Sequence, residues 1–278
     1  MKVFTWWQAS LLALFGGLMI VFSVVNFNAL IHPDDGLQIL NWKRDEDFGV
    51  EYWRRVIMVT SGIASFTGAL CVVLVARGKL SNYFWGIINC VFYGVYAFAY
   101  GYAGDAQLNI FFFLPFQFAG TYTWNRNLDL EQTARARTMK WYQWLGTSVV
   151  VVGLSFGLYY EIPLFARWIS GVYYFEDLEV PRRLEATSIS LSIMAQVLMT
   201  YRFWEQWLLW ITINCIQIAM YSGVTGFGVD FNIVAMWTLF QANALMGLYQ
   251  WVVRWWRERS EPKVADRAVA ETVTVTTV

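Results

Sequence analysis

Charged residues are scarce in this chain. Only 14% of its 278 residues are Asp, Glu, Lys or Arg, whereas 58% are hydrophobic and 19% are aromatic. A soluble domain carries about 25% charged residues, so the composition excludes an ordinary soluble domain and indicates a membrane protein. Lys plus Arg and Asp plus Glu both number 20. This balance gives no basic surface of the kind that binds nucleic acid, and we expect no nucleic-acid partner.

Residues that could carry out chemistry inside a membrane are also few. The single histidine is His32, and Cys71, Cys90 and Cys215 lie in apolar runs without the spacing of metal ligands or of a disulfide framework. An intramembrane hydrolase needs a nucleophile with a base, paired acids or a metal. A retinal protein needs a lysine within a span, and every lysine of this chain lies outside the apolar runs. We therefore expect no enzymatic activity, no cofactor and no metal site.

Long apolar runs are what the chain has in abundance. A helix needs roughly 20 such residues to cross the hydrocarbon layer, and these runs lack the alternation of a membrane β-strand. The first run is too long for a signal peptide and lacks a small-residue cleavage site, which leaves that alternative weaker than a span. The predicted spans are residues 4–30, 54–76, 83–101, 106–125, 141–160, 184–203, 206–222 and 230–253.

One stretch of the chain is repeated. An offset of 125 residues lays 77–105 over 202–230 and pairs Trp85 with Trp210 and Asn89 with Asn214. Each copy belongs to a unit of three spans, and the span between the units restores the second to the orientation of the first. The sequence predicts an all-α membrane protein of eight transmembrane helices, with one extra N-terminal helix and a 3+1+3 parallel repeat like that of SWEET sugar exporters.

This repeat divides the chain into five predicted parts. They are an additional N-terminal helix and loop (1–52), the first three-helix repeat (53–127), a linker with the connecting helix (128–183), the second repeat (184–256) and a mobile C-terminal tail (257–278). Thirteen of the 20 Lys and Arg residues fall on the side that holds both termini, and seven on the other. Cytoplasmic loops are the richer in Lys and Arg, so we expect both termini in the cytoplasm and the loops near Asp105 and Asp230 outside.

Amide and aromatic side chains share faces of the predicted spans. Trp210, Asn214, Gln217 and Tyr221 follow the i, i+4, i+7, i+11 spacing of one helix face. Amides in hydrocarbon are costly unless they are paired, so we expect them to point inward, toward a substrate path. The candidate substrate-binding residues are Trp85, Asn89, Tyr93, Gln117, Gln196, Trp210, Asn214, Gln217, Tyr221, Trp237 and Gln241.

These residue types have ordinary uses too. Trp residues at the ends of spans form interfacial belts, and Trp85 lies close enough to an end to be one of them. Buried amides also bridge helices without a ligand, each contributing roughly 0.6 to 2 kcal/mol. Read as a binding site, the set offers planes for stacking and cation–π attraction, with amides for a carboxamide or hydroxyls. A flat, cationic ring attached to a polyol fits this chemistry.

Acidic residues are absent from the interiors of the predicted spans. Asp105, Asp230, Glu161, Glu185 and Glu205 all fall near span ends. Proton relays and sodium sites generally use buried carboxylates, so the pattern predicts downhill transport without ion coupling.

Several of these segments resemble the PnuC family of nicotinamide riboside transporters. The resemblance covers residues 54–256, and it is carried by "WGIINCVFYGVY…GDAQLN", by Gln117 and Gly120 with Trp124, by "SIMAQVLMTYRFWEQWLLW", and by Asn214, Tyr221 and "GLYQW". The extra first helix departs from the commonest seven-helix pattern of that family.

The resemblance implies uptake of nicotinamide riboside by facilitated diffusion across the bacterial inner membrane. A cytosolic riboside kinase would then trap the substrate for NAD synthesis, and we expect a homo-oligomer in the lipid bilayer, a trimer being one form. Related family members carry thiamine or riboflavin, so these vitamins remain alternatives. A sugar carrier of the SWEET type is the other alternative, because a sugar ring also stacks on Trp and pairs with Asn.

Overall fold

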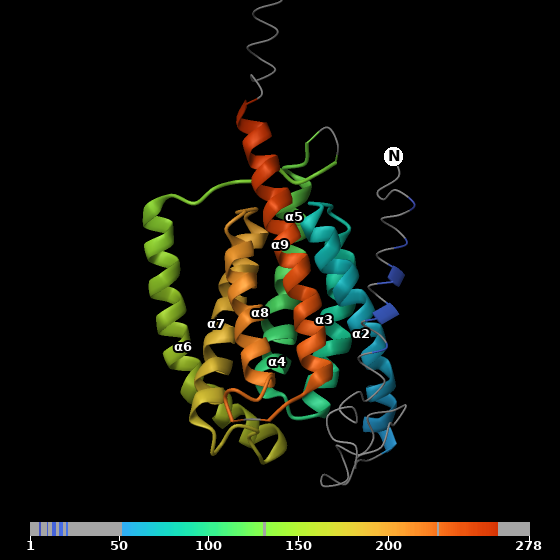
Figure 1. Ribbon diagram of the computed structural model, residues 1–278, viewed down its shortest axis with the longest axis vertical. Helices are drawn as coiled ribbons and strands as arrows, with labels where there is room; N and C mark the ends of the chain where they lie inside the picture. The colour runs from blue at the N-terminus through green and yellow to red at the C-terminus, as the bar shows by residue number, and fades with distance from the viewer. Residues whose placement is uncertain are drawn as a thin grey trace, which may run out of the picture.

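The computed structural model describes residues 52–129, 132–226 and 228–260 and seven isolated positions between 6 and 21, with the backbone alone at 52–62 and Asn232. Within these ranges the chain is a bundle of helices, with no β-strand beyond isolated bridges (Figure 1). The elements are α2 (Tyr52–Ala76), α3 (Asn82–Ala99), α4 (Ala103–Gln107), the π-helix η4 (Leu108–Phe113), α5 (Leu114–Asn125), α6 (Trp141–Ser170), α7 (Glu179–Thr200), α8 (Gln206–Tyr221) and α9 (Phe231–Ser260).

The helices follow seven of the predicted spans, and three of them have an end that differs from the prediction by five residues or more. α6 continues to Ser170, α7 begins at Glu179 and α9 runs to Ser260, all beyond the predicted boundaries. Hydropathy marks where an apolar run stops, whereas backbone hydrogen bonds can carry a helix on into a polar region. The predicted span at 4–30, apart from the isolated positions, and the predicted tail from residue 261 onward lie outside the described residues.

The fourth predicted span is one continuous helical segment made of α4, η4 and α5. Its six-residue π-helical part ends two residues before Pro115. Proline has no N–H to donate to the carbonyl four residues earlier, here that of Phe111, and a helix commonly widens where a bond of the ladder is lost. The local sequence therefore explains why the turn is wide at this point.

α6 stands at the edge of the bundle, where it packs mainly on α7 (Figure 1). Among the described residues it is the one helix long and apolar enough to cross a membrane by length and composition alone, and Ile63–Ala76 is a shorter apolar stretch. The apolar side chains of Val149, Val152 and Phe156 remain exposed on α6.

The turns α2–α3 and α7–α8 have the same hydrogen bonds. Gly78 N donates to Val75 O and Lys79 N to Leu74 O, while Arg202 N donates to Met199 O and Phe203 N to Leu198 O. Gly78 and Arg202 both lie in the left-handed region, with φ of +65° and +66°. These pairs are 124 residues apart, so the offset of 125 predicted from the sequence is wrong at the turn by one residue.

Both turns lie at the same end of the bundle. The segment between α5 and α6 contacts each of them, because Ala134 N donates to Gly78 O at 2.9 Å and Arg137 N to Arg202 O at 2.8 Å. The first helix triplet is α2, α3 and the segment α4–η4–α5, and the second is α7, α8 and α9. The two triplets therefore present equivalent turns to one linker.

Two glycines allow close packing near these turns. A Cβ on Gly120 of α5 would collide with Tyr83 of α3, and a Cβ on Gly247 of α9 would collide with the ring of Trp207 of α8. Tyr83 and Trp207 occupy equivalent positions after the two turns. The two triplets thus share the same close contact between their second and third helices.

Candidate substrate site

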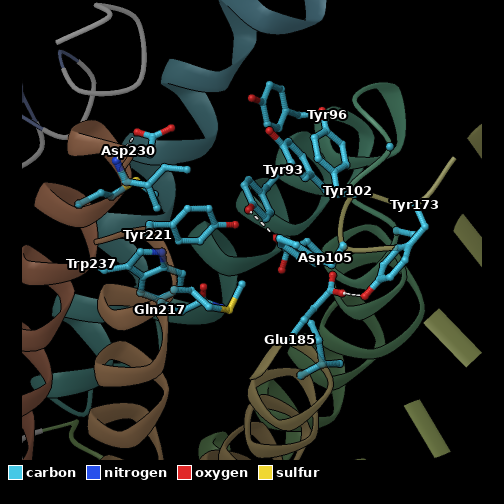
Figure 2. A pocket seen from close by; sticks show the side chains of 18 of the residues that line it. Tyr93, Tyr96, Tyr102, Asp105, Tyr173, Glu185, Gln217, Tyr221, Asp230 and Trp237 are labelled. Atoms are coloured by element: carbon cyan, nitrogen blue, oxygen red, sulfur yellow. Dashed lines mark hydrogen bonds between the residues drawn. The ribbon is translucent and has the colours of Figure 1, made fainter. Parts of the chain in front are cut away.

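A cavity lies at the end of the bundle opposite these turns. Figure 2 shows its lining, which comes from α3, α4, α7, α8 and α9, and from the loop 171–178 between α6 and α7. In Figure 1 this is the lower end, where α4 lies and the α8–α9 loop crosses. One residue of α2, Ser65, also lines the cavity.

Tyrosines form much of one wall. Tyr93 and Tyr96 lie three residues apart on α3, which places them on neighbouring turns of one face, and their rings are 6.1 Å apart. The ring centres of Tyr96 and Tyr102 are 6.3 Å apart. Tyr102 stacks on Tyr174 of the loop 171–178 at 5.2 Å with an interplanar angle of 22°. This wall offers several ring faces for stacking to a flat ligand.

Two carboxylates on the same wall accept hydrogen bonds from tyrosines. The Tyr93 hydroxyl donates to Oδ2 of Asp105 at 3.1 Å, and the Tyr173 hydroxyl donates to Oε2 of Glu185 at 2.7 Å (Figure 2). Burial, and then the neighbouring Glu185, raise the pKa of Tyr173 well above its usual value. Tyr173 therefore keeps its proton and remains a hydrogen-bond donor at physiological pH.

The opposite wall comes from α8 and α9. Gln217 and Tyr221 lie one helical turn apart on α8, and Trp237 of α9 lies beside them (Figure 2). Gln217 Nε2 donates to the hydroxyl of Ser188 on α7 at 2.9 Å. Asp230, at the start of α9, accepts the backbone N–H of Ile233 at 3.1 Å and so serves as an N-terminal helix cap.

Comparison with known proteins identifies the group to which this chain belongs. Residues 58–253 match the family model described as "Nicotinamide mononucleotide transporter". A protein of Neisseria mucosa, called nicotinamide riboside transporter PnuC, is 30% identical over 200 residues, which are 69% of this chain and 71% of the relative. The chain belongs to the PnuC family of membrane transporters.

Other PnuC proteins are similar over a comparable length. The nicotinamide riboside transporters PnuC of Haemophilus influenzae and Escherichia coli are 30% and 26% identical over 68% of this chain, which covers 77% and 83% of their lengths. The solved crystal structure of the vitamin B3 transporter PnuC superposes with a TM-score of 0.62 and covers 91% of this chain and 94% of that one, at 24% identity. The chain therefore has the PnuC fold, and the cavity from Ser65 to Trp237 lies within the family match.

Four of the eleven candidate residues line the cavity, namely Tyr93, Gln217, Tyr221 and Trp237. In the first triplet the other three lie elsewhere. Asn89 donates to the carbonyl of Ala64 on α2 at 2.8 Å. Gln117 donates to the sulfur of Cys90 at 3.7 Å, and Trp85 contacts the rings of Phe66 and Phe84.

The remaining four candidates lie in the second triplet, outside the cavity lining. Gln196 and Asn214 are both 3% exposed. Trp210 and Trp237 pack against the same buried apolar cluster, so Trp210 lies next to the inner side of the cavity wall. Nε2 of Gln196 and Oε1 of Gln241 are buried without a hydrogen-bond partner among the described residues.

The sequence reasoning missed one wall of the cavity. Its residues lie at helix ends and in loops and were not among the eleven candidates, although Tyr96 shares the helix face of Trp85 and Asn89. They are Tyr96, Tyr102, Asp105, Tyr173, Tyr174 and Glu185. Glu185 was placed near a span end, but α7 begins at Glu179, so Glu185 lies in its second turn. The aromatic sequence "VYYF" at 172–175 and the repeated Asp at 105 and 230 were the available signals.

Proposed function

We propose that this chain takes up nicotinamide riboside across the bacterial inner membrane. The observation that carries the proposal is the cavity lined by tyrosines, Trp237 and Gln217 in a chain whose relatives are nicotinamide riboside transporters. The substrate passes through without chemical change, so the protein is a transporter and not an enzyme.

The lining has the chemistry that this substrate requires. Nicotinamide riboside joins a positively charged pyridinium ring to a ribose. Aromatic faces such as Tyr221 and Trp237 attract a cationic ring with about 0.5 to 2 kcal/mol each. The amide of Gln217 and the tyrosine hydroxyls can pair with the carboxamide and the ribose hydroxyls, because they both donate and accept.

The deeper candidates form the next part of the proposed path. Trp210, Asn214, Gln196 and Gln241 contact the substrate after it passes Trp237, and the unpartnered amide atoms of Gln196 and Gln241 support this role. Buried polar atoms of this kind are costly, and hydroxyls of a passing ribose would pair with them.

In the first triplet, the proposed contacts require a rearrangement. Asn89 bonds to the backbone of α2 and Gln117 to Cys90, so their amides must exchange these partners to reach the substrate. We propose that they do so, together with Trp85, when the two triplets move relative to each other during transport.

The proposed architecture is that of eight spans with a parallel, SWEET-like repeat in the divisions predicted from the sequence. The linker that bonds to both equivalent turns supports it. With both termini in the cytoplasm, the turns face the cell interior and the cavity opens to the outside, where substrate arrives. The active form is a homo-oligomer, for which a trimer is one arrangement.

Transport runs downhill, without coupling to an ion gradient. The acids in the cavity face the positive charge of the substrate itself. Phosphorylation by a cytosolic kinase keeps the gradient of free riboside directed inward, and it supplies NAD synthesis.

Uptake of labelled nicotinamide riboside into proteoliposomes tests the proposal. With the membrane potential held at zero, because the riboside is a cation, we expect accumulation to stop when the inner and outer concentrations are equal, whether or not a sodium or proton gradient is imposed. An excess of unlabelled riboside inside should speed entry of the label by exchange. Absence of riboside uptake, with uptake of labelled thiamine, riboflavin or sucrose instead, would assign the site to another substrate. Accumulation above the outside concentration in an ion gradient would contradict downhill transport.

A further inference from the structure

The cavity has two acidic side chains on one wall. Asp105 and Glu185 both line it, from α4 and α7, and Figure 2 shows their carboxylates near each other. The backbone of Gly104, next to Asp105, lies close to Glu185, since a Cβ on Gly104 would be only 2.9 Å from Oε1 of Glu185. Glycine at 104 thus lets the Glu185 carboxylate approach the start of α4.

No positive side chain offsets these acids from within the described lining, which contains neither Lys nor Arg. Arg183 and Arg182 are the nearest cations in sequence to Glu185, and both contact other groups. Arg183 pairs with Glu179. Arg182, one position farther away, donates twice to the carbonyl of Tyr159, at 3.1 and 2.9 Å, and lies 4.0 Å from the centre of the Tyr159 ring. The Asp105 and Glu185 carboxylates therefore face the cavity with tyrosine hydroxyls as their partners.

We infer that Asp105 and Glu185 read the charge of the transported molecule, and that they make this cavity selective for a cation that lacks a phosphate. The inference rests on the proposed function and names the residues that set its specificity. A pyridinium ring placed between the tyrosines would be attracted by both carboxylates and by the ring faces. A phosphate in the same place would be repelled by both carboxylates, and the described lining contains no Lys or Arg to hold it.

Selection by charge would distinguish nicotinamide riboside from nicotinamide mononucleotide, which differ by one phosphate. The family model is described by the mononucleotide, whereas the relatives are described by the riboside. Rejection of the phosphorylated form would also prevent the product of the cytosolic kinase from leaving through the same cavity. Like-charge contacts are an effective means of excluding a competitor.

Asp230 provides an internal contrast. It also lines the cavity, but its carboxylate caps α9 through the N–H of Ile233. A capping carboxylate contributes to helix stability by about 0.5 to 2 kcal/mol. Its replacement by Asn, itself a good cap, should therefore change selectivity less than neutralisation of Asp105 or Glu185.

The experiment pairs a change of charge in the protein with a change of charge in the ligand. Binding of nicotinamide riboside and of its neutral dihydropyridine form is measured by calorimetry on wild type, Asp105→Asn and Glu185→Gln. The two ligands have nearly the same shape, so their difference reports on charge. Asp177→Asn is the matched control, because Asp177 is an exposed acid of the loop 171–178 outside the lining.

We expect the wild type to prefer the cationic riboside. Each neutralisation should weaken binding of the cationic riboside by about tenfold, which corresponds to about 1.4 kcal/mol. The affinity for the neutral form should stay within about twofold of that of the wild type. Nicotinamide mononucleotide should bind the variants more tightly than the wild type, and the control should match the wild type throughout.

Equal losses for the cationic and neutral ligands would overturn the inference, because the acids would then support only the fold. A wild type that binds both forms equally would also overturn it. A wild type that binds neither ligand would instead contradict the proposed function, so the two failures are distinct. If one variant fails to fold, the other with both ligands still completes the comparison.

Discussion

Trp124 and Trp251 meet between the two helix triplets, and each donates a hydrogen bond to the opposite triplet. Their rings are 5.6 Å apart. Nε1 of Trp124 on α5 donates to the carbonyl of Met199 on α7, and Nε1 of Trp251 on α9 donates to the carbonyl of Val75 on α2, both at 2.9 Å. The third helix of each triplet thus holds the first helix of the other, at the end opposite the cavity.

Replacing either tryptophan by Phe should lower stability by a similar amount. Both side chains are fully buried. Each variant removes one of the two hydrogen bonds that the carbonyl of Met199 or Val75 accepts, the other coming from Arg202 N or Gly78 N, at a cost of about 0.5 to 1.5 kcal/mol. Thermal melting in detergent would measure it. Trp141→Phe is the control, since Trp141 is 78% exposed, and it should melt with the wild type. A large shift for one buried tryptophan and none for the other would show that the two contacts are not equivalent.

Gly120→Ala and Gly247→Ala should both destabilise the protein, because the added methyl group collides with Tyr83 or Trp207. Overpacking of this kind costs about 1 to 3 kcal/mol, which should appear as a lower melting temperature. Gly153→Ala on α6 is the matched control, since a Cβ there meets nothing within 4 Å. Normal melting of both core variants would mean that the close helix contacts are absent in the protein in solution.

The helices and the family could be predicted from the sequence, because long apolar runs and the paired segments around Trp85 and Trp210 are local features. The register of the repeat could not be fixed in this way. Identical residues favoured an offset of 125, but the turns at Gly78 and Arg202 correspond at 124. With the offset of 124 set by the turns, Asn214 corresponds to Cys90, and both side chains are buried.

The site was predicted only in part, for a physical reason. Helical periodicity finds residues that share a face, and this identified Gln217 and Tyr221 on α8. The opposite wall is assembled from the loop 171–178, from α4 and from the second turn of α7, which come together through tertiary packing. No periodicity along the chain signals that Tyr173 and Asp105 line the same cavity.

Asn214→Leu should weaken binding of nicotinamide riboside by about threefold to tenfold, because one net hydrogen bond contributes about 0.5 to 1.5 kcal/mol. Leu is close in size to Asn, so the helix should be retained. Cys215→Leu is the control, since Cys215 follows Asn214 on α8 and its side chain is exposed. Calorimetry would compare the two variants with the wild type. Unchanged affinity in a folded Asn214→Leu protein would remove this residue from the path.

The most direct measurement is a calorimetric titration of nicotinamide riboside into the wild type and into the double variant Tyr221→Leu/Trp237→Leu. The two rings face the cavity from α8 and α9 (Figure 2), and their loss removes about 1 to 4 kcal/mol of cation–π attraction. The account predicts saturable binding to the wild type that is lost or at least about fivefold weaker in a variant with the same oligomeric state. Equal binding to both proteins would contradict the account, because the riboside would then bind somewhere other than this cavity.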